Sequence, residues 1–155
     1  MSVFKQSKRT ELYEKKKAKH PGYKYSRRDF INSEESGNIL VSFHEIEPLN
    51  SAYPFHYHLK NEEVFYIISG FGTLQTLEGT RPVSAGDILY FPPNEGGAHK
   101  LFNDSKTERL IYIDFSATHD LDVTIYPESK KLGIWSKAFN KIFKINSNVD
   151  YFEGE

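Results

Sequence analysis

Two histidines and a carboxylate lie close together between residues 55 and 70, in the stretch FHYHLKNEEVFYIISG. His56 and His58 are separated by one residue, so in an extended strand both imidazoles lie on the same face. Glu63 opens the hydrophobic run that follows. If the two runs pair through the short connection 59–61, all three side chains converge on one interior. Imidazole and carboxylate ligands together are typical of transition-metal sites, so this stretch predicts half of a metal centre.

A fourth candidate ligand lies in a second stretch between residues 86 and 103, GDILYFPPNEGGAHKLFN. A hydrophobic strand is interrupted there by a loop rich in proline and glycine, and the next strand begins with His99. Three imidazoles and one carboxylate would suit divalent Fe, Mn, Ni, Zn, Co or Cu, and the ligand types do not distinguish among these metals. One alternative stays open, in which the same side chains form a hydrogen-bonded cluster without metal.

The two stretches resemble the two sequence motifs of the cupin superfamily. The first motif is His-x-His, four residues, Glu, six residues and Gly, and it is matched in full by His56, His58, Glu63 and Gly70. The second motif is matched by Gly86, Pro92, His99 and Asn103. Its loop is longer than usual, because Gly96 and Gly97 stand where one nearer glycine is expected. The stretch 126–129 and the C-terminal ending are similar to those of small, single-domain bacterial cupins of the cupin 2 type.

This resemblance implies an all-β fold, the double-stranded β-helix or jelly-roll barrel, with the metal centre inside it. Strand parity puts Phe65 and Ile67 on the same face as Glu63, and Leu101 on the same face as the fourth ligand. We therefore expect Phe65, Ile67 and Leu101 to line an apolar wall of the ligand pocket.

Strand patterns support the barrel. Runs of β-prone residues, separated by turns with Gly, Pro, Asn or Asp, are typical of a sandwich or barrel. The expected strands are Ile39–Ile46, Tyr53–His58, Glu63–Ser69, Gly72–Leu77, Asp87–Phe91, His99–Phe102, Leu110–Phe115 and Val123–Tyr126, with a turn at Glu78-Gly79-Thr80.

Charge divides the chain into an arm and a barrel. Residues 1–28 carry ten basic and two acidic residues, and Thr10–Lys19 is predicted to form a short helix that ends before His20-Pro21-Gly22. This basic arm would either meet an acidic patch, a phosphate or nucleic acid, or, in the interpretation we favour, pack against the acidic barrel. Residues 29–127 form the expected barrel. Residues 128–155 contain enough apolar side chains to pack on the barrel or on a dimer partner.

Composition narrows the class of protein. The chain has 155 residues and a net charge of −1, which suits one domain and makes a nucleic-acid partner unexpected. Cysteine is absent, which excludes disulfides and thiolate chemistry. The charged N-terminus is unlike a signal peptide, and no run is long and apolar enough to span a membrane. We expect a cytoplasmic homodimer that binds a small molecule and has no membrane partner.

Three functions fit such a site. The first is a metal-dependent enzyme, an isomerase, decarboxylase or dioxygenase, that acts on a small oxygen-rich molecule with Glu62, Tyr53 or His119 as acid or base. The second is a binding or sensing module without turnover, and the third is a metal-free structural barrel. Lys100 should point away from the site, and no basic cluster is expected on the inner faces, which counts against a phosphosugar isomerase. We expect His44 to be a packed residue. The sequence does not decide whether the chain is an enzyme, because one fold hosts many reactions.

Overall fold

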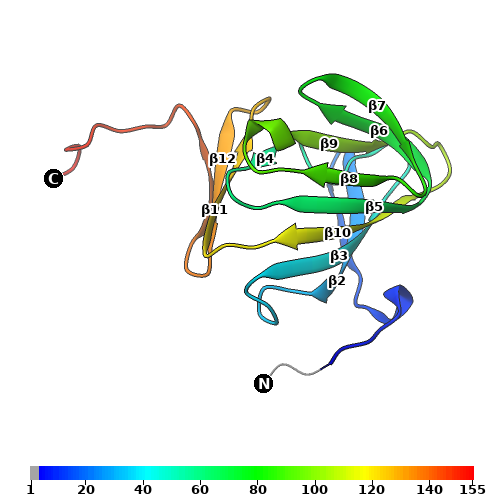
Figure 1. Ribbon diagram of the computed structural model, residues 1–155. Helices are drawn as coiled ribbons and strands as arrows, with labels where there is room; N and C mark the ends of the chain where they lie inside the picture. The colour runs from blue at the N-terminus through cyan, green and yellow to red at the C-terminus, as the bar shows by residue number, and fades with distance from the viewer. Residues whose placement is uncertain (1–3) are drawn as a thin grey trace.

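The computed structural model describes residues 4–155, so the first three residues of the expected arm lie outside it. The chain forms two facing layers of antiparallel strands (Figure 1). One layer is a six-stranded sheet of order β1-β2-β3-β10-β5-β8. The other contains a four-stranded sheet, β13-β12-β11-β4, and a three-stranded sheet, β7-β6-β9. The strands are β1 (Lys15–His20), β2 (Tyr23–Ile31), β3 (Ile39–Ile46), β4 (Tyr57–His58), β5 (Glu63–Ser69), β6 (Phe71–Thr76), β7 (Gly79–Ser84), β8 (Ile88–Phe91), β9 (His99–Asn103), β10 (Leu110–Ala117), β11 (Leu121–Tyr126), β12 (Lys131–Ser136) and β13 (Asn140–Lys144).

The jelly-roll barrel expected from the sequence is confirmed. Its core lies between the two layers, where each strand contributes alternate side chains. On β5, Phe65 and Ile67 are buried together with Glu63, while the intervening Tyr66 and Ile68 are exposed. The core cluster consists of Ile46, Ala52, Phe65, Ile67, Leu74, Val83, Phe91, Leu101, Leu110 and Tyr112.

The helix predicted over Thr10–Lys19 is wrong. Only a short 3-10 turn, Arg9–Glu11, is found there, and Lys15–His20 forms β1, which pairs with β2 across the turn at Pro21 and Gly22. Gly22 has a φ of 79°, which suits glycine at such a turn. All six residues of β1 are exposed. A lysine-rich sequence is tolerated on an exposed edge strand, where charge discourages further strand pairing.

The arm is joined to the barrel rather than separate from it. Strand β2 crosses the expected boundary at residue 28 and pairs with β3 along most of its length. Basic residues of the arm pair with carboxylates of this sheet and of the loop between β2 and β3: Arg9 and Arg28 with Glu45, Lys15 with Asp29, and Lys5 with Glu35 of the loop.

The predicted pairing of the two strands around 59–61 is also wrong. Strand β4 pairs with β11, whereas β5 lies between β10 and β8 in the opposite layer. The connection 59–61 therefore crosses from one layer to the other instead of forming a hairpin. As a consequence, Glu63 faces the two histidines across the barrel.

Five strands were not predicted. Two of them, β1 and β2, lie largely within the expected arm. Strand β7 occupies residues 79–84, beginning where only a turn was expected, and β12 and β13 extend the sheet beyond β11. All five residues of β13 are exposed, and the chain then runs away from the barrel (Figure 1). Within residues 4–155, no helix is long and apolar enough to cross a membrane.

Candidate metal centre and cavity

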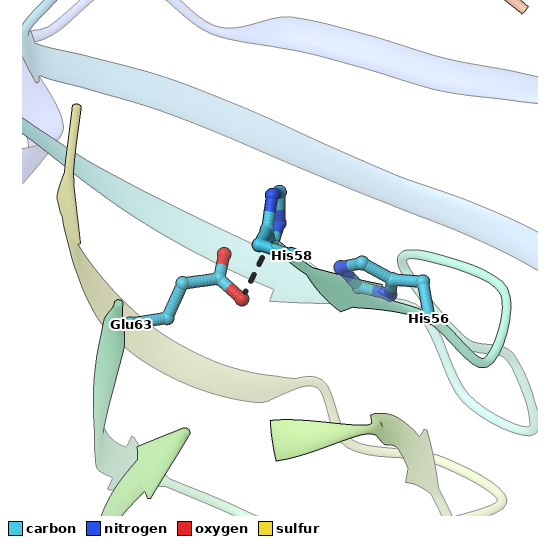
Figure 2. Close-up of side chains that lie close together, drawn as sticks. All are labelled: His56, His58 and Glu63. Atoms are coloured by element: carbon cyan, nitrogen blue, oxygen red, sulfur yellow. Dashed lines mark ion pairs between the residues drawn. The ribbon is translucent and has the colours of Figure 1, made fainter. Parts of the chain in front are cut away.

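The four predicted ligands come from both layers. His58 lies on β4, His56 comes just before this strand, and His99 opens β9. Two backbone hydrogen bonds join His56 to His99. Glu63 projects from β5 toward the imidazoles (Figure 2). The backbone bridge holds the two histidine-bearing strands side by side, and the carboxylate closes the site from the other layer.

The ligand atoms of these residues lie within a few ångströms of one another. Ligand atoms of His56, His58 and Glu63 all fall within 4.8 Å of each other. Glu63 Oε2 is 3.7 Å from His58 Nε2 and 3.4 Å from His99 Nε2. The rings of His56 and His99 are 4.7 Å apart between centroids. The structure therefore brings all four candidates into one cluster.

Each imidazole is oriented through its Nδ1 atom. Nδ1 of His56 donates to the Pro54 carbonyl, and Nδ1 of His99 donates to the Gly97 carbonyl, both at 2.8 Å. Nδ1 of His58 donates to the carboxylate of Asp122 at 2.5 Å. A carbonyl or a carboxylate can only accept, so Nδ1 carries the proton and Nε2 keeps its lone pair. This arrangement is the usual outer support of metal-binding histidines.

The glycine-rich loop explains how the Gly97 carbonyl reaches His99. A Cβ atom at Gly97 would lie 1.8 Å from the Pro92 carbonyl oxygen, so only glycine fits there. A Cβ atom at Gly96 would meet nothing within 4 Å. The loop longer than the family pattern thus ends in a short 3-10 turn, Glu95–Gly97, that leads directly into β9.

Two atoms of the cluster are buried without a hydrogen-bond partner among the described residues, Glu63 Oε2 and His99 Nε2. Unpaired buried polar atoms are rare and point to a function or to a bound group. When Glu63 is ionised, its carboxylate oxygen and the imidazole lone pair of His99 are both electron donors and cannot satisfy each other. A divalent cation would satisfy both.

The electrostatics of the cluster suit metal binding. Burial lowers the pKa of His56 to about 4 and that of His99 well below its usual range, so both are neutral at pH 7. Burial alone would lower the pKa of His58, but the hydrogen bond to Asp122 and the nearby carboxylates of Glu63, Asp122 and Asp114 together outweigh burial and raise it. Burial raises the pKa of Glu63. Neutral imidazoles are the form that binds metal.

A cavity of about 360 Å³ opens beside the cluster. Its walls come from both layers, and the residues that line it are Arg27, Leu40, Tyr53, His56, His58, Asn61, Glu63, Phe65, Asp114, Ser116, Thr124, Tyr126 and Trp135. Of the apolar wall predicted from the sequence, Phe65 borders this cavity. Ile67 and Leu101 are buried in the core behind it. A larger hollow of about 690 Å³ lies outside, between β1 and the loop 52–55, and none of the four ligands borders it.

Of the acid–base candidates, only Tyr53 borders the cavity. The carboxylate of Glu62 accepts a hydrogen bond from the Tyr90 hydroxyl at the exposed surface, and exposed His119 contacts Asn61. His44 is fully buried, as expected of a packed residue, and stacks on Tyr112 with 4.9 Å between ring centroids.

Sequence reasoning missed several side chains of the site. Asp122 supports His58 from 64 positions away in the chain, a separation at which no local spacing signals contact. Trp135 donates to the Thr124 hydroxyl, which in turn lies 3.1 Å from His58 Nδ1. Asp114 borders the cavity, and burial, with Glu63 nearby, raises its pKa to about 8. Arg27 places a cation in a cavity for which none was expected.

Residues 42–116 match the model of the Cupin domain family. A protein of Acidithiobacillus ferrooxidans ATCC 23270, provisionally named as a sugar phosphate isomerase, is similar in structure with a TM-score of 0.75 at 25% identity, covering 91% of this chain and 90% of that chain. A sugar phosphate isomerase from a cupin superfamily, of Silicibacter pomeroyi DSS-3, has a TM-score of 0.82 at 14% identity, covering 95% and 98%. The polyketide cyclase of Streptomyces resistomycificus has a TM-score of 0.64 at 20% identity, covering 76% and 81%. The latter two likenesses show the fold alone. No curated protein matches the chain in sequence.

Proposed function

This chain is a small cupin-domain protein, and from that premise we propose that His56, His58, Glu63 and His99 together hold one divalent transition metal. The observation that carries the proposal is the pair of buried, unpartnered atoms, Glu63 Oε2 and His99 Nε2. Each such atom costs about 1–3 kcal/mol when left unpaired, and a cation between them would remove that cost. The metal would be Fe, Mn, Ni, Zn, Co or Cu, since the ligand types suit all of them.

A small oxygen-rich molecule would bind in the adjoining cavity, where a bound metal supplies a Lewis acid that polarises an oxygen atom. Asp114 is mostly protonated at pH 7 and would donate a hydrogen bond or a proton to that molecule. Tyr53 offers a second hydroxyl at the wall. Phe65 and Trp135 would exclude water from one side of the ligand.

Isomerisation of a small phosphorylated or polyhydroxylated molecule is the reaction that we favour. Two observations support it: Arg27 borders the cavity, and the similar protein of Acidithiobacillus ferrooxidans carries the provisional name of a sugar phosphate isomerase. A binding module without turnover is the second candidate. Following aldose and ketose phosphates by NMR after addition of metal-loaded protein separates the two. Interconversion supports the enzyme, whereas binding without interconversion supports the module.

The metal proposal is tested by elemental analysis of untagged protein purified without added metal. We expect near-stoichiometric transition metal in the wild type and in His119→Ala, whose exposed imidazole lies outside the cluster. The double variant His56→Ala/His99→Ala should contain none and should keep its far-UV circular dichroism spectrum. Equal metal in the wild type and the double variant would refute the ligand assignment. A wild type that takes up no metal after reconstitution would favour the metal-free barrel.

We also propose that the chain forms a homodimer through the outer face of β5, β8 and β10. This face carries exposed Tyr66, Ile68, Ile88, Tyr90 and Phe115. Tyr66 and Ile88 are direct neighbours in the sheet, so the apolar surface is continuous there. Contiguous exposed apolar patches commonly mark protein interfaces. Light scattering on purified protein measures the mass in solution, and a monomeric mass would contradict the proposal.

A further inference from the structure

Arg27 enters the cavity from β2. Side chains of this strand alternate, and Tyr25, Arg27 and Asp29 share the inward face, because Tyr25 packs on the core and Arg27 borders the cavity. The register with β3 places Arg27 opposite His44. Its guanidinium therefore lies on the inner side of the barrel, beside the Tyr53 hydroxyl and within the same cavity as His56, His58 and Glu63.

The guanidinium is only partly used by the protein. Its Nε donates to Asp29 at 2.5 Å, and the other oxygen of Asp29 accepts from Lys15 Nζ at 2.7 Å. One carboxylate is therefore shared by two cations, and this group keeps a net positive charge. Among the described residues, the structure gives the Nη1 and Nη2 atoms of Arg27 no hydrogen bond to a carboxylate or carbonyl. The Tyr53 hydroxyl is a further polar partner of the guanidinium. The Arg27 side chain is 30% exposed and borders the cavity, so a ligand there can reach the guanidinium.

The remaining carboxylates near the cavity are engaged elsewhere. Asp122 accepts from His58 and from the backbone N–H groups of Lys60 and Asn61. Asp114 accepts from the Ser116 hydroxyl at 2.7 Å. Among the described residues, Arg27 makes a direct ion pair only with Asp29, although its charge also acts on Asp114 and Glu63.

A basic rim continues outward from Arg27. A hollow of about 470 Å³ shares Arg27 and Leu40 with the cavity, and its other charged residues are Lys15, Lys17, Asp29 and Glu34, so cations exceed carboxylates by one. Cations along the approach to a cavity raise the local concentration of anions and speed their association. Part of the basic arm recognised in the sequence thus lies at the entrance to the site.

We propose that Arg27 binds the anionic end of the ligand, and that this end is a carboxylate or a phosphate. Nη1 and Nη2 form a planar fork that matches two oxygens of either group. A cavity of about 360 Å³ limits the ligand to a small molecule, whose other end would offer a hydroxyl or carbonyl oxygen to the histidine–glutamate cluster. The inference deepens the function proposed above and rests on it, because it assigns the ligand class of the same cavity.

Isothermal titration of metal-loaded protein with lactate, glycerol 3-phosphate and glycerol tests this assignment. Lactate and glycerol 3-phosphate separate the carboxylate from the phosphate, and glycerol offers hydroxyls alone. We expect at least one anion to bind the wild type and glycerol to bind far more weakly. Arg27→Gln should weaken that anion at least tenfold, since a charge-assisted pair is lost. Arg27→Lys keeps the charge but not the planar fork, so its anion affinity should lie between that of the wild type and that of Arg27→Gln.

The matched control is Arg81→Gln, which removes the same charge from an exposed position on β7. It should bind the anion as the wild type does. Equal anion affinity in the wild type and Arg27→Gln would overturn the inference, as would binding of neither anion by metal-loaded wild type. Metal content, measured on the same samples, keeps the two proposals distinct. If the wild type takes up no metal on reconstitution but still binds an anion through Arg27, only the metal centre is refuted. If the metal-loaded wild type binds neither anion, only the role of Arg27 is refuted.

Discussion

Replacing Asp122 by asparagine should weaken metal binding at least tenfold while leaving the fold intact. Asp122 is 2% exposed, and one oxygen of its carboxylate accepts from His58 Nδ1 at 2.5 Å, while the other accepts from the backbone N–H groups of Lys60 and Asn61 at 3.0 and 3.3 Å. Asparagine has the same shape but only one oxygen, which can accept either from His58 or from the two backbone N–H groups. The substitution therefore removes the charge and one of the two acceptors.

The size of the effect follows from that difference. A hydrogen bond to a charged group contributes about 1.5–3 kcal/mol and one between neutral groups about 0.5–1.5 kcal/mol. The loss from charge alone is thus about 1–1.5 kcal/mol, and about 1.4 kcal/mol corresponds to a factor of ten in affinity. The lost acceptor adds to this effect, and loss of outer support commonly costs metal sites about 10- to 100-fold in affinity. We therefore expect a loss of at least tenfold.

Competition for Zn²⁺ with a fluorescent chelator at about pH 8 measures this change, since imidazoles are mostly deprotonated there. Asp120→Asn is the control, because Asp120 is an exposed carboxylate two positions away. Its affinity should equal that of the wild type. If Asp122→Asn binds Zn²⁺ as tightly as the wild type, the carboxylate does not support a metal-binding His58, and the argument from the three oriented Nδ1 atoms fails.

Two further predictions address the loop and the buried histidine. Gly97→Ala should reduce metal affinity at least tenfold, because its Cβ would clash with Pro92 and displace the carbonyl that orients His99. Gly96→Ala should keep the metal affinity of the wild type, because its Cβ would meet no neighbour. An equal loss of metal affinity in both variants would argue against this geometry. Burial, aided by the charge of Arg27, lowers the pKa of His44 to about 3 from 6.5. The unfolded chain therefore binds the extra proton, and stability present above pH 6.5 is lost as the pH falls toward 3. The free energy of unfolding is measured with denaturant in the presence of a chelator. Between pH 7 and about 4.5, it should fall by about 2–3 kcal/mol less for His44→Phe than for the wild type. An identical fall in both proteins would contradict the assignment.

Features set by strand periodicity could be predicted from the sequence. The bounds of β3 and β5 agree with the expected ranges, and the inward placement of Phe65, Ile67 and Leu101 is correct. These features depend on alternation within a few residues, which the sequence displays directly.

Features that depend on pairing over distance could not be predicted in this way. The helix over Thr10–Lys19 and the hairpin around 59–61 were both wrong, since β1 exists through its pairing with β2 and β4 through its pairing with β11. Arg27 is an intermediate case. It was counted with the basic arm, although its alternation with Tyr25 and Asp29 was a usable signal of an inward face.

The residues that sequence reasoning missed lie mostly outside the cupin motif, which predicts the metal ligands but not the residues that line the cavity. The family match spans residues 42–116 and contains all four proposed ligands, so the proposed centre would follow from that segment. Much of the cavity wall lies outside it: Arg27 on β2, Thr124 and Tyr126 on β11, and Trp135 on β12. The motif can therefore predict a metal centre without predicting a ligand. Because the flanking strands supply the one arginine that borders the cavity within residues 4–155, and two of its aromatic rings, chains that share the motif and differ in those strands should bind different molecules.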